Sequence, residues 1–194
     1  MLPFLRVEAV AVPLPQGNIN TDLIIPARFL RKQRAEGFGK YLFNDLRFDE
    51  ANQEIGTFAL NQAAYRSAQI IVAGANFGCG SSREMAVWAL SDYGVRAIIA
   101  PSFGDIFFNN CVRNGLLCVV LEAPIVDDLL ALLEREPGST LTVDLVTQTV
   151  HASAPAAYAF AVDPFNKKCL LQGLDGVDYT LQFADQIAAF EARQ

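Results

Sequence analysis

The sequence predicts an α/β fold, with a mainly parallel central sheet, helices packed on it and an additional β-hairpin. From residue 61 onward, short apolar runs alternate with helical patterns, which is typical of parallel strands joined by helical crossovers. Residues 139–151 then alternate with a period of two and indicate a hairpin on one side of the sheet. The 194 residues are 52% hydrophobic and contain no linker and no internal repeat, so we expect residues 1–194 to form a single domain.

The N-terminal quarter of the chain is less regular. Residues 4–12 alternate loosely and predict a first strand that ends at Pro13 and Pro15. The segment 28–47 is rich in basic and aromatic residues, and we expect a long loop there with at most short helices. Long loops in compact domains are often functional, although the charges of this segment also fit a solvated face.

The regular part of the chain contains most of the predicted elements. We expect strands at residues 69–73, 95–100 and 116–121, and helices at residues 61–67, 81–93, 104–114 and 124–135. Pro124 and the pair Pro137-Gly138 bracket the last of these helices. Residues 85–90 are apolar nearly all round, so the helix that contains them should be buried. A short helix from Asp185 to Ala192 is expected to close the chain.

One turn combines several features of an anion site. It joins the strand 69–73 to the next helix, and its sequence is Asn76-Phe77-Gly78-Cys79-Gly80-Ser81-Ser82-Arg83-Glu84. Gly78 and Gly80 let backbone N–H groups approach a ligand closely, and the helix that follows directs its positive dipole end at the turn. Arg83 adds a guanidinium group suited to carboxylate or phosphate. The sequence therefore predicts an oxyanion-binding turn.

A simpler explanation exists for part of this turn. Ser81 and Glu84 have the spacing of a capping box, which alone would account for both residues. Capping, however, requires neither Arg83 nor two glycines. The turn lacks the lysine of a phosphate-binding P-loop, and the dinucleotide pattern Gly-x-Gly-x-x-Gly fails at Arg83. A second polar segment, residues 18–22, either contributes to a site or only bonds to its own turn backbone.

Composition limits the partners and the location of the chain. A net charge of −6 and a pI near 4.7 argue against binding nucleic acid or anionic membranes. No apolar run approaches the ~20 residues of a membrane span, and Arg6 and Glu8 interrupt the apolar N-terminus too early for a signal peptide. We therefore expect a cytoplasmic protein. The positive mean hydropathy of +0.25 favours a chain that buries one face against a partner.

Cysteine and histidine usage predicts no metal site in this chain. The four cysteines are widely spaced without a Cys-x-x-Cys pair, which excludes the usual zinc and iron–sulfur patterns, and we expect them to be reduced. They are Cys79, Cys111, Cys118 and Cys169. His151 is the only histidine and lies in a strand-like segment, so we expect it to be structural and unavailable for a catalytic triad.

Several motifs together resemble the small subunit of 3-isopropylmalate dehydratase, a family equivalent to the swivelling fourth domain of aconitase. The resemblance covers about residues 4 to 190. Its motifs are residues 76–84, 88–94, 99–103, 18–22 with 24–26, 43–45 with 47–48, and 114–117.

The resemblance implies a β/β/α swivelling domain and a heteromeric hydro-lyase. Its reaction would isomerise 2-isopropylmalate, a 2-hydroxy dicarboxylate, to 3-isopropylmalate through isopropylmaleate in leucine biosynthesis. This chain would carry no cofactor. A four-iron, four-sulfur cluster would belong to a separate large subunit, whose iron would act as a Lewis acid on the leaving hydroxyl group.

The resemblance also assigns the site residues. Catalytic roles would fall to Ser81, as the base, and Asp22, and substrate-binding roles to Ser82, Arg83, Gly80 and Thr21. Without histidine, a serine can act as a base only if its alkoxide is stabilised electrostatically, which a helix N-terminus and Arg83 would do. A further arginine is expected in the 28–47 loop, and the candidates are Arg28, Arg31, Arg34 and Arg47.

Two departures from the family pattern leave the substrate open. Many members have His-Ala-Pro where this chain has Met85-Ala86-Val87, and Asn20 replaces the usual aspartate. A related enzyme for methylmalate, dimethylmalate or a homocitrate-type acid would keep the same site residues. A non-catalytic, carboxylate-binding regulatory subunit is the alternative from another class.

Overall fold

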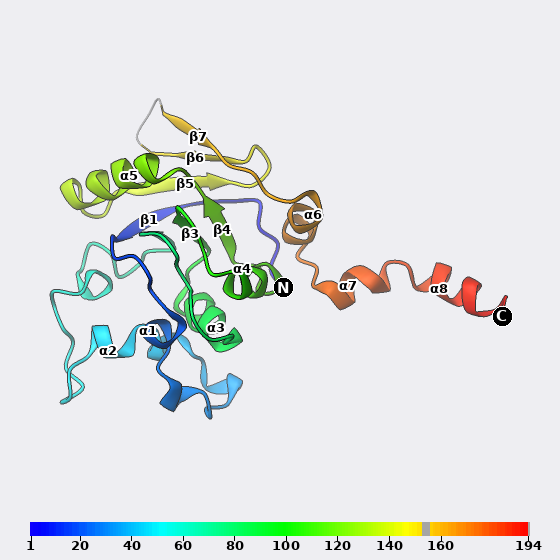
Figure 1. Ribbon diagram of the computed structural model, residues 1–194, viewed down its shortest axis with the longest axis horizontal. Coiled ribbons are helices and arrows are strands. Elements are labelled where there is room, and N and C mark those ends of the chain that lie inside the picture. Colours follow the sequence, from blue (N-terminus) through cyan, green and yellow to red (C-terminus); the bar gives the residue numbers. More distant parts are fainter. Residues whose placement is uncertain (153–155, 194) are drawn as a thin grey trace.

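A computed structural model describes residues 1–152 and 156–193 and contains one seven-stranded sheet (Figure 1). The strand order is β4-β3-β2-β1-β5-β6-β7. The strands are β1 (Arg6–Leu14), β2 (Ile70–Ala73), β3 (Ala97–Ala100), β4 (Leu117–Val120), β5 (Thr140–Asp144), β6 (Thr149–His151) and β7 (Ala157–Ala159). Strands β1 to β4 are parallel, and β5, β6 and β7 extend the sheet antiparallel from β1. The α/β prediction and its hairpin, β5–β6, are confirmed, whereas β7 was not predicted.

Strand β1 runs past the proline that was predicted to end it. Pro13 stands opposite Val72 and Leu14 opposite Ala73 in the parallel pairing with β2. On its other side, β1 pairs with β5 only as far as Val10. Because the last residues of β1 have a neighbouring strand on one side only, the N–H group that proline lacks is not needed for a second ladder.

Eight α-helices accompany the described sheet. They are α1 (Thr21–Ile24), α2 (Asn44–Arg47), α3 (Glu84–Tyr93), α4 (Asp105–Asn114), α5 (Ala123–Arg135), α6 (Pro164–Gln172), α7 (Gly176–Leu181) and α8 (Ala184–Glu191). Helices α4, α5 and α8 lie within one residue of their predicted bounds, and α6 and α7 were not predicted. The loop 28–47 contains only short helical turns, as expected.

The helix predicted at residues 61–67 is wrong. The structure has a 3₁₀ turn at Ala59–Asn61 followed by irregular turns. A segment this short gains little from helix formation alone, and tertiary contacts decide its path. The Asn61 amide donates to two backbone carbonyls, and the Tyr65 hydroxyl donates to the carbonyl of Leu133 (2.8 Å).

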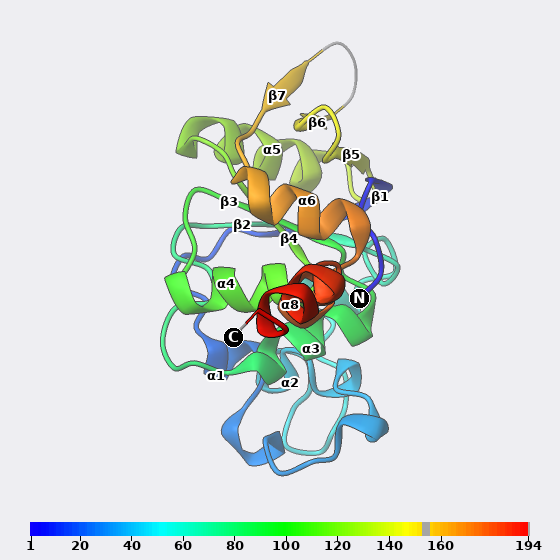
Figure 2. The same ribbon diagram turned by 90° about the vertical axis from the view of Figure 1, so that its right-hand side faces the viewer.

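Helices cover both faces of the sheet (Figures 1 and 2). Successive residues of a strand point to opposite faces, so the uninterrupted apolar run of β2 serves two cores. Ile71 packs in the core that includes α3 and α4, whereas Ile70 packs in the core that includes α5. Each such side chain contributes about 1.5–3 kcal/mol when it is fully buried. Helix α3 is buried at Ala86, Val87, Ala89 and Leu90, as its apolar sequence predicts.

The loops that follow β1, β2 and β3 meet at the carboxyl edge of the parallel strands. The Gly78 N–H group donates to the Ile19 carbonyl (2.7 Å), and the Phe77 N–H group donates to the Ser102 carbonyl (3.1 Å). Ligands of such sheets bind at this edge. Among the residues described, no helix is long and apolar enough to cross a membrane.

Candidate active site

The two polar segments of the sequence lie side by side. Asn20 and Cys79 form a parallel bridge, and the Thr21 N–H group donates to the Cys79 carbonyl (3.0 Å). These contacts join the start of α1 to the turn before α3, about sixty residues further along the chain. The segment 18–22 therefore does more than bond to its own backbone, because it fixes the position of the glycine-rich turn.

Glycine is required at position 78. Its φ of +72° lies in the left-handed region, and a Cβ atom there would lie 2.1 Å from Cγ of Phe107. The Phe107 ring is itself held against Phe77, with 5.5 Å between the ring centroids. The backbone of the turn thus packs directly on α4, and this contact fixes the position of the residues that follow Gly78.

Ser81 does not cap a helix. Helix α3 begins at Glu84 and not at residue 81 as predicted, and its N-cap is Arg83, with no side-chain hydrogen bond. The Glu84 carboxylate instead accepts a hydrogen bond from the Asn114 amide (2.9 Å). Ser81 is exposed, and its hydroxyl group forms no hydrogen bond with the described part of the chain. The capping box is thus contradicted by the structure.

Thr21 fixes the backbone of Ser81. Its side chain is only 2% exposed, and its hydroxyl group donates to the Ser81 carbonyl (2.9 Å). A hydroxyl group has a single O–H donor, and because that of Thr21 is already used, it cannot also donate to a ligand carboxylate. The contact that the structure gives Thr21 is therefore with the turn itself.

Arg83 and Asp22 form an ion pair across the site. The Arg83 side chain is 15% exposed and that of Asp22 is 56% exposed, so the guanidinium lies in the wall of the site and the carboxylate at its rim. One terminal nitrogen of Arg83 contacts Asp22. The five N–H donors of a guanidinium leave others available for a second oxyanion. Gly80 and Ser82 are exposed beside Ser81.

Two asparagines, Asn18 and Asn76, hold the same turn in place, and this role was not predicted from the sequence. The Asn76 amide donates to the side-chain oxygen of Asn18 (2.7 Å), and the Asn76 N–H group donates to the Ser102 hydroxyl (2.9 Å). Asn18 and Asn76 both have positive φ, at 56° and 61°. Asparagine tolerates this conformation better than other side chains, and that preference was the available signal.

Arg47 is buried and structural. Its Nε–H donates to the Asn61 side-chain oxygen (3.1 Å), and its guanidinium lies over the ring of Tyr93 at 5.0 Å. Burial lowers the pKa of Arg47. A guanidinium held in this way is not available to a ligand in the site.

Two other arginines of the 28–47 loop are already paired. Arg28 forms an ion pair with Asp45, and the hydrogen bond from Arg28 lowers the pKa of that carboxyl group. Arg34 forms an ion pair with Asp92. Burial alone would raise the pKa of Asp92, but hydrogen bonds from Arg34 and from the Phe38 N–H group lower it.

Arg31 differs from the other three arginines of the loop. It is exposed and forms no hydrogen bond or ion pair within residues 1–152 and 156–193. It is therefore the loop arginine whose charge remains available to a ligand.

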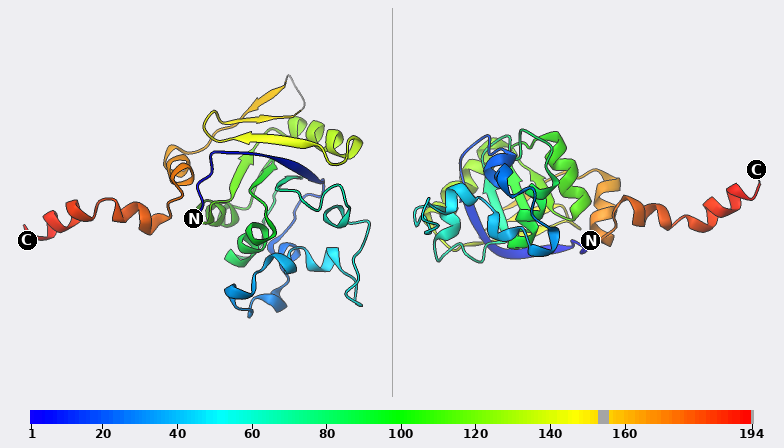
Figure 3. Two further views of the ribbon diagram at one scale, coloured as in Figure 1. Left: turned by 180° about the vertical axis from the view of Figure 1, so that it is seen from behind. Right: turned by 90° about the horizontal axis from the view of Figure 1, so that it is seen from below.

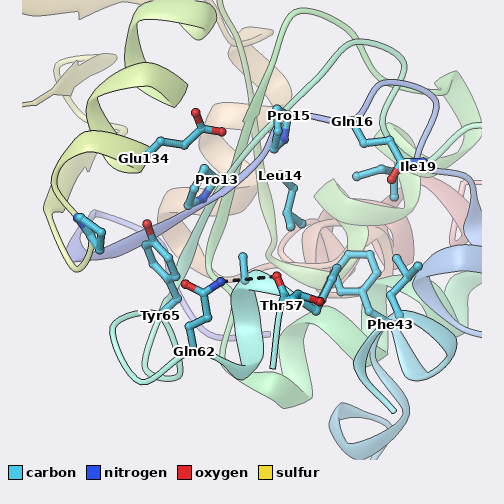
Figure 4. Close-up of a pocket in the computed structure, with 14 residues that line it drawn as sticks. Pro13, Leu14, Pro15, Gln16, Ile19, Phe43, Thr57, Gln62, Tyr65 and Glu134 are labelled. Carbon is cyan, nitrogen blue, oxygen red and sulfur yellow. Dashed lines mark hydrogen bonds between the residues drawn. The ribbon is translucent and has the colours of Figure 1, made fainter. Parts of the chain in front are cut away.

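An apolar pocket of about 440 Å3 lies beside the end of β1 (Figure 4). Its walls include Leu14, Phe43 and Tyr65, and none of residues 76–84 lines it. The only charged residue in its lining is Glu134, which would repel a dicarboxylate. The glycine-rich turn, and not this pocket, has the charges that an anionic ligand requires.

The cysteines and the histidine lie outside the turn, apart from Cys79. Cys111, Cys118 and Cys169 are buried, and burial raises the pKa of Cys111 well above its usual value. His151 is exposed in β6, within the antiparallel part of the sheet. In the described residues, no group of three or more His, Cys, Asp or Glu side chains could hold a metal ion.

Comparison with known proteins defines the class. Residues 1–124 match the family model described as the aconitase C-terminal domain, and residues 127–164 match a second model, described as LeuD_N. A crystal structure of 3-isopropylmalate dehydratase from Methanocaldococcus jannaschii has the same fold, with a TM-score of 0.68 and 24% sequence identity. The likeness covers 96% of this chain and 99% of that one. The chain is thus of the aconitase C-terminal type, and its swivelling-domain fold is confirmed.

More similar relatives narrow the class. The 3-isopropylmalate dehydratase small subunit of Paramagnetospirillum magneticum is 51% identical over 98% of this chain and 95% of its own length. The protein of the same name from Rhodospirillum centenum is 49% identical over 100% of this chain and 96% of its own length. The chain belongs to the family of 3-isopropylmalate dehydratase small subunits.

Proposed function

We propose that this chain supplies the base and the carboxylate-binding groups of a dehydratase that isomerises 2-isopropylmalate to 3-isopropylmalate through isopropylmaleate. The observation that best supports this function is the free, exposed hydroxyl group of Ser81 beside the Arg83–Asp22 ion pair. Helix capping does not account for that hydroxyl group. We propose a role in leucine biosynthesis because the chain belongs to the family of 3-isopropylmalate dehydratase small subunits.

Ser81 acts as the base in this proposal. Its alkoxide takes the proton from the carbon next to the one that bears the hydroxyl group, and loss of that hydroxyl leaves isopropylmaleate. The hydroxide that leaves, or one from solvent in exchange, then adds to the carbon that lost the proton, and Ser81 returns its proton to the carbon that lost the hydroxyl group. The uncapped N-terminus of α3 and the guanidinium of Arg83 stabilise the alkoxide, since no histidine lies in this turn.

The remaining site residues bind and orient. Arg83, Ser82 and the backbone of Gly80 bind a substrate carboxylate, and Asp22 holds the Arg83 guanidinium in place through their ion pair. For Thr21 we propose a positioning role in place of direct substrate binding, because its buried hydroxyl group holds the Ser81 carbonyl.

The partner in this proposal is the large subunit of the dehydratase. Three of the four cysteines here are buried and no metal-binding group is present among the described residues, so this chain does not fit a four-iron, four-sulfur cluster. We assign the cluster to the large subunit, where its iron would supply Lewis-acid chemistry. We also propose that residues 1–194 form one domain. We further propose a cytoplasmic location, because unpaired cysteines are typical of a reducing compartment.

Reconstitution tests this function. The chain is mixed with the large subunit from the same organism and assayed with 2-isopropylmalate, methylmalate, dimethylmalate and homocitrate. We expect turnover of 2-isopropylmalate by the complex and none by either subunit alone. Preference for another diacid would identify a related dehydratase. Binding without turnover of any diacid would favour the regulatory subunit, and turnover by this chain alone would contradict the two-subunit function.

Replacement of Arg83 by lysine should weaken carboxylate binding. Lysine keeps the positive charge but loses the planar fork that binds two carboxylate oxygens. We expect KM of the reconstituted complex to rise about tenfold or more, because a hydrogen bond to a charged group contributes about 1.5–3 kcal/mol. Steady-state kinetics measure this, and circular dichroism checks the fold. Unchanged kinetics would mean that Arg83 does not bind substrate.

We propose Arg31 as the further arginine that binds the second carboxylate. Arg31→Gln should raise KM about tenfold while the free energy of unfolding stays the same, because the side chain has no partner within the described chain. Arg34→Gln is the matched control. It breaks the pair with Asp92 and should affect stability more than KM. If Arg31→Gln left KM unchanged, the second carboxylate would have to bind elsewhere.

A further inference from the structure

The last twenty residues of the described chain form an arm that leaves the body of the protein. We define the C-terminal arm as residues 174–193, which include α7 and α8 (Figures 1 and 3). No residue of α7 or α8 is buried. The last residues of the two hydrophobic cores are Cys118 and Leu170, so the body closes its cores without the arm.

The arm carries apolar side chains that nothing in the described chain covers. Val177, Leu181, Ile187 and Phe190 are 41–68% exposed, and they are four of the ten large hydrophobic side chains that are exposed in the described chain. Ile187 and Phe190 are three residues apart in α8 and therefore neighbours on one helix face. Isolated helices of six and eight residues are marginal in water, so a partner is needed to stabilise them.

Two contacts with α6 attach the start of the arm to the body. The Tyr179 ring packs edge-on against Phe165 of α6, with 4.9 Å between centroids, and the Lys168 ammonium group lies 4.9 Å from the Tyr179 centroid. Within the arm, the Tyr179 ring also packs against Phe183, with 5.4 Å between the ring centroids. The arm is thus attached to α6 at its start, and α8 projects away from the body (Figures 1 and 3).

The charge of the arm indicates the chemistry of its partner. The arm contains four carboxylates, at Asp175, Asp178, Asp185 and Glu191, against one arginine, which gives it a net charge of −3. The whole chain is also acidic, at −6, so a second copy of the chain would oppose like charges. The complementary surface is an apolar groove with a basic rim on a different protein.

The extent of the family matches points to the same partner. The aconitase C-terminal domain model ends at residue 124 and the second model at residue 164, so neither reaches the arm. The small subunit from Rhodospirillum centenum, in contrast, matches this chain over its full length. A domain within one chain is held by its covalent linker, whereas a separate subunit must hold its partner through surface contacts alone. The arm is present in a chain of the separate-subunit type, which needs such surface contacts.

We infer that the C-terminal arm docks into an apolar, basic-rimmed groove of the dehydratase large subunit and helps to hold the two subunits together. This inference rests on the proposed function, because it requires a large subunit as the partner. Ile187 and Phe190 are the central contacts, since buried aromatic and aliphatic side chains contribute most of the binding energy of an interface.

Introduction of charge on the apolar face of α8 tests the inference in the full-length chain. The double variant Ile187→Asp, Phe190→Asp should bind the purified large subunit at least about tenfold more weakly by isothermal titration calorimetry. Val146→Asp is the matched control. It introduces one negative charge, half of the charge that the double variant adds, at a residue of similar exposure in the β5–β6 turn, and it should bind like the unaltered chain. Hydrogen exchange of residues 184–191 should slow when the large subunit is added.

The outcomes separate the inference from the function on which it rests. If the unaltered chain binds and gives turnover, while the double variant binds equally well, the arm has no docking role and the proposed function stands. If the unaltered chain does not bind the large subunit, both are overturned. If the chain alone forms a dimer in light scattering that the double variant abolishes, the arm binds a second copy and the inference is wrong.

Discussion

Ser81→Ala should lower kcat of the reconstituted enzyme by about 10²–10⁴-fold, the usual cost of losing a general base. The same change should leave the free energy of unfolding nearly unchanged. The Ser81 side chain is exposed and caps no helix, so the loss of about 1 kcal/mol that accompanies removal of an N-cap does not apply here. Thermal unfolding and kcat are to be measured on the same preparation.

Ser82→Ala is the matched control for this experiment. It removes a neighbouring exposed hydroxyl group from the same turn. If Ser82 binds a carboxylate, its loss should raise KM and change kcat much less than the loss of Ser81. A Ser81→Ala enzyme that remained nearly as fast as the unaltered one would place the base elsewhere, and the large subunit would then be the first place to look.

Much of the fold was predictable because its parallel half combines two strong local signals. Strands β2 and β3 are buried on both faces and have uninterrupted apolar sequences, and the segment between them has the helix-forming sequence of α3, without Gly or Pro. Strand β7 has only three residues, Ala-Tyr-Ala, and gives no such signal. The start of α6 could have been predicted, because Asp163 caps its first turn and Pro164 is its first residue. These two signals were not used.

The proposed site residues were named from the sequence, but the contacts between them could not be. The pairing of Thr21 with the turn at residues 78–81 depends on β1 lying next to β2, and a local pattern contains no information on strand order. The Ser-x-x-Glu spacing was ambiguous for a similar reason. Arg83 has an extended backbone, with φ of −137° and ψ of 101°, which delays the start of α3 and leaves Ser81 outside it.

Gly78→Ala should destabilise the chain by about 2–5 kcal/mol, a large share of the 5–15 kcal/mol that is typical of a folded protein. About 1–2 kcal/mol arises from placing a side chain at positive φ, and about 1–3 kcal/mol from forcing a methyl group against Phe107. The turn must also shift away from α4, and a displacement of about 1 Å at Ser81 would lower kcat about 10²-fold.

Gly80→Ala separates these two costs. Gly80 also has positive φ, at 92°, but a Cβ atom there would meet only Asn20 Cβ at 3.6 Å and Thr21 Oγ1 at 3.8 Å, which is ordinary contact. It should therefore show the conformational cost alone. Combining Gly78→Ala with Phe107→Ala makes room for the methyl group, so the pair should lose less stability than the sum of the single variants. Urea unfolding measures the free energy of unfolding of these four variants, Phe107→Ala alone included, against the unaltered chain. Equal losses for Gly78→Ala and Gly80→Ala would show that the packing of the turn on Phe107 does not hold it in place.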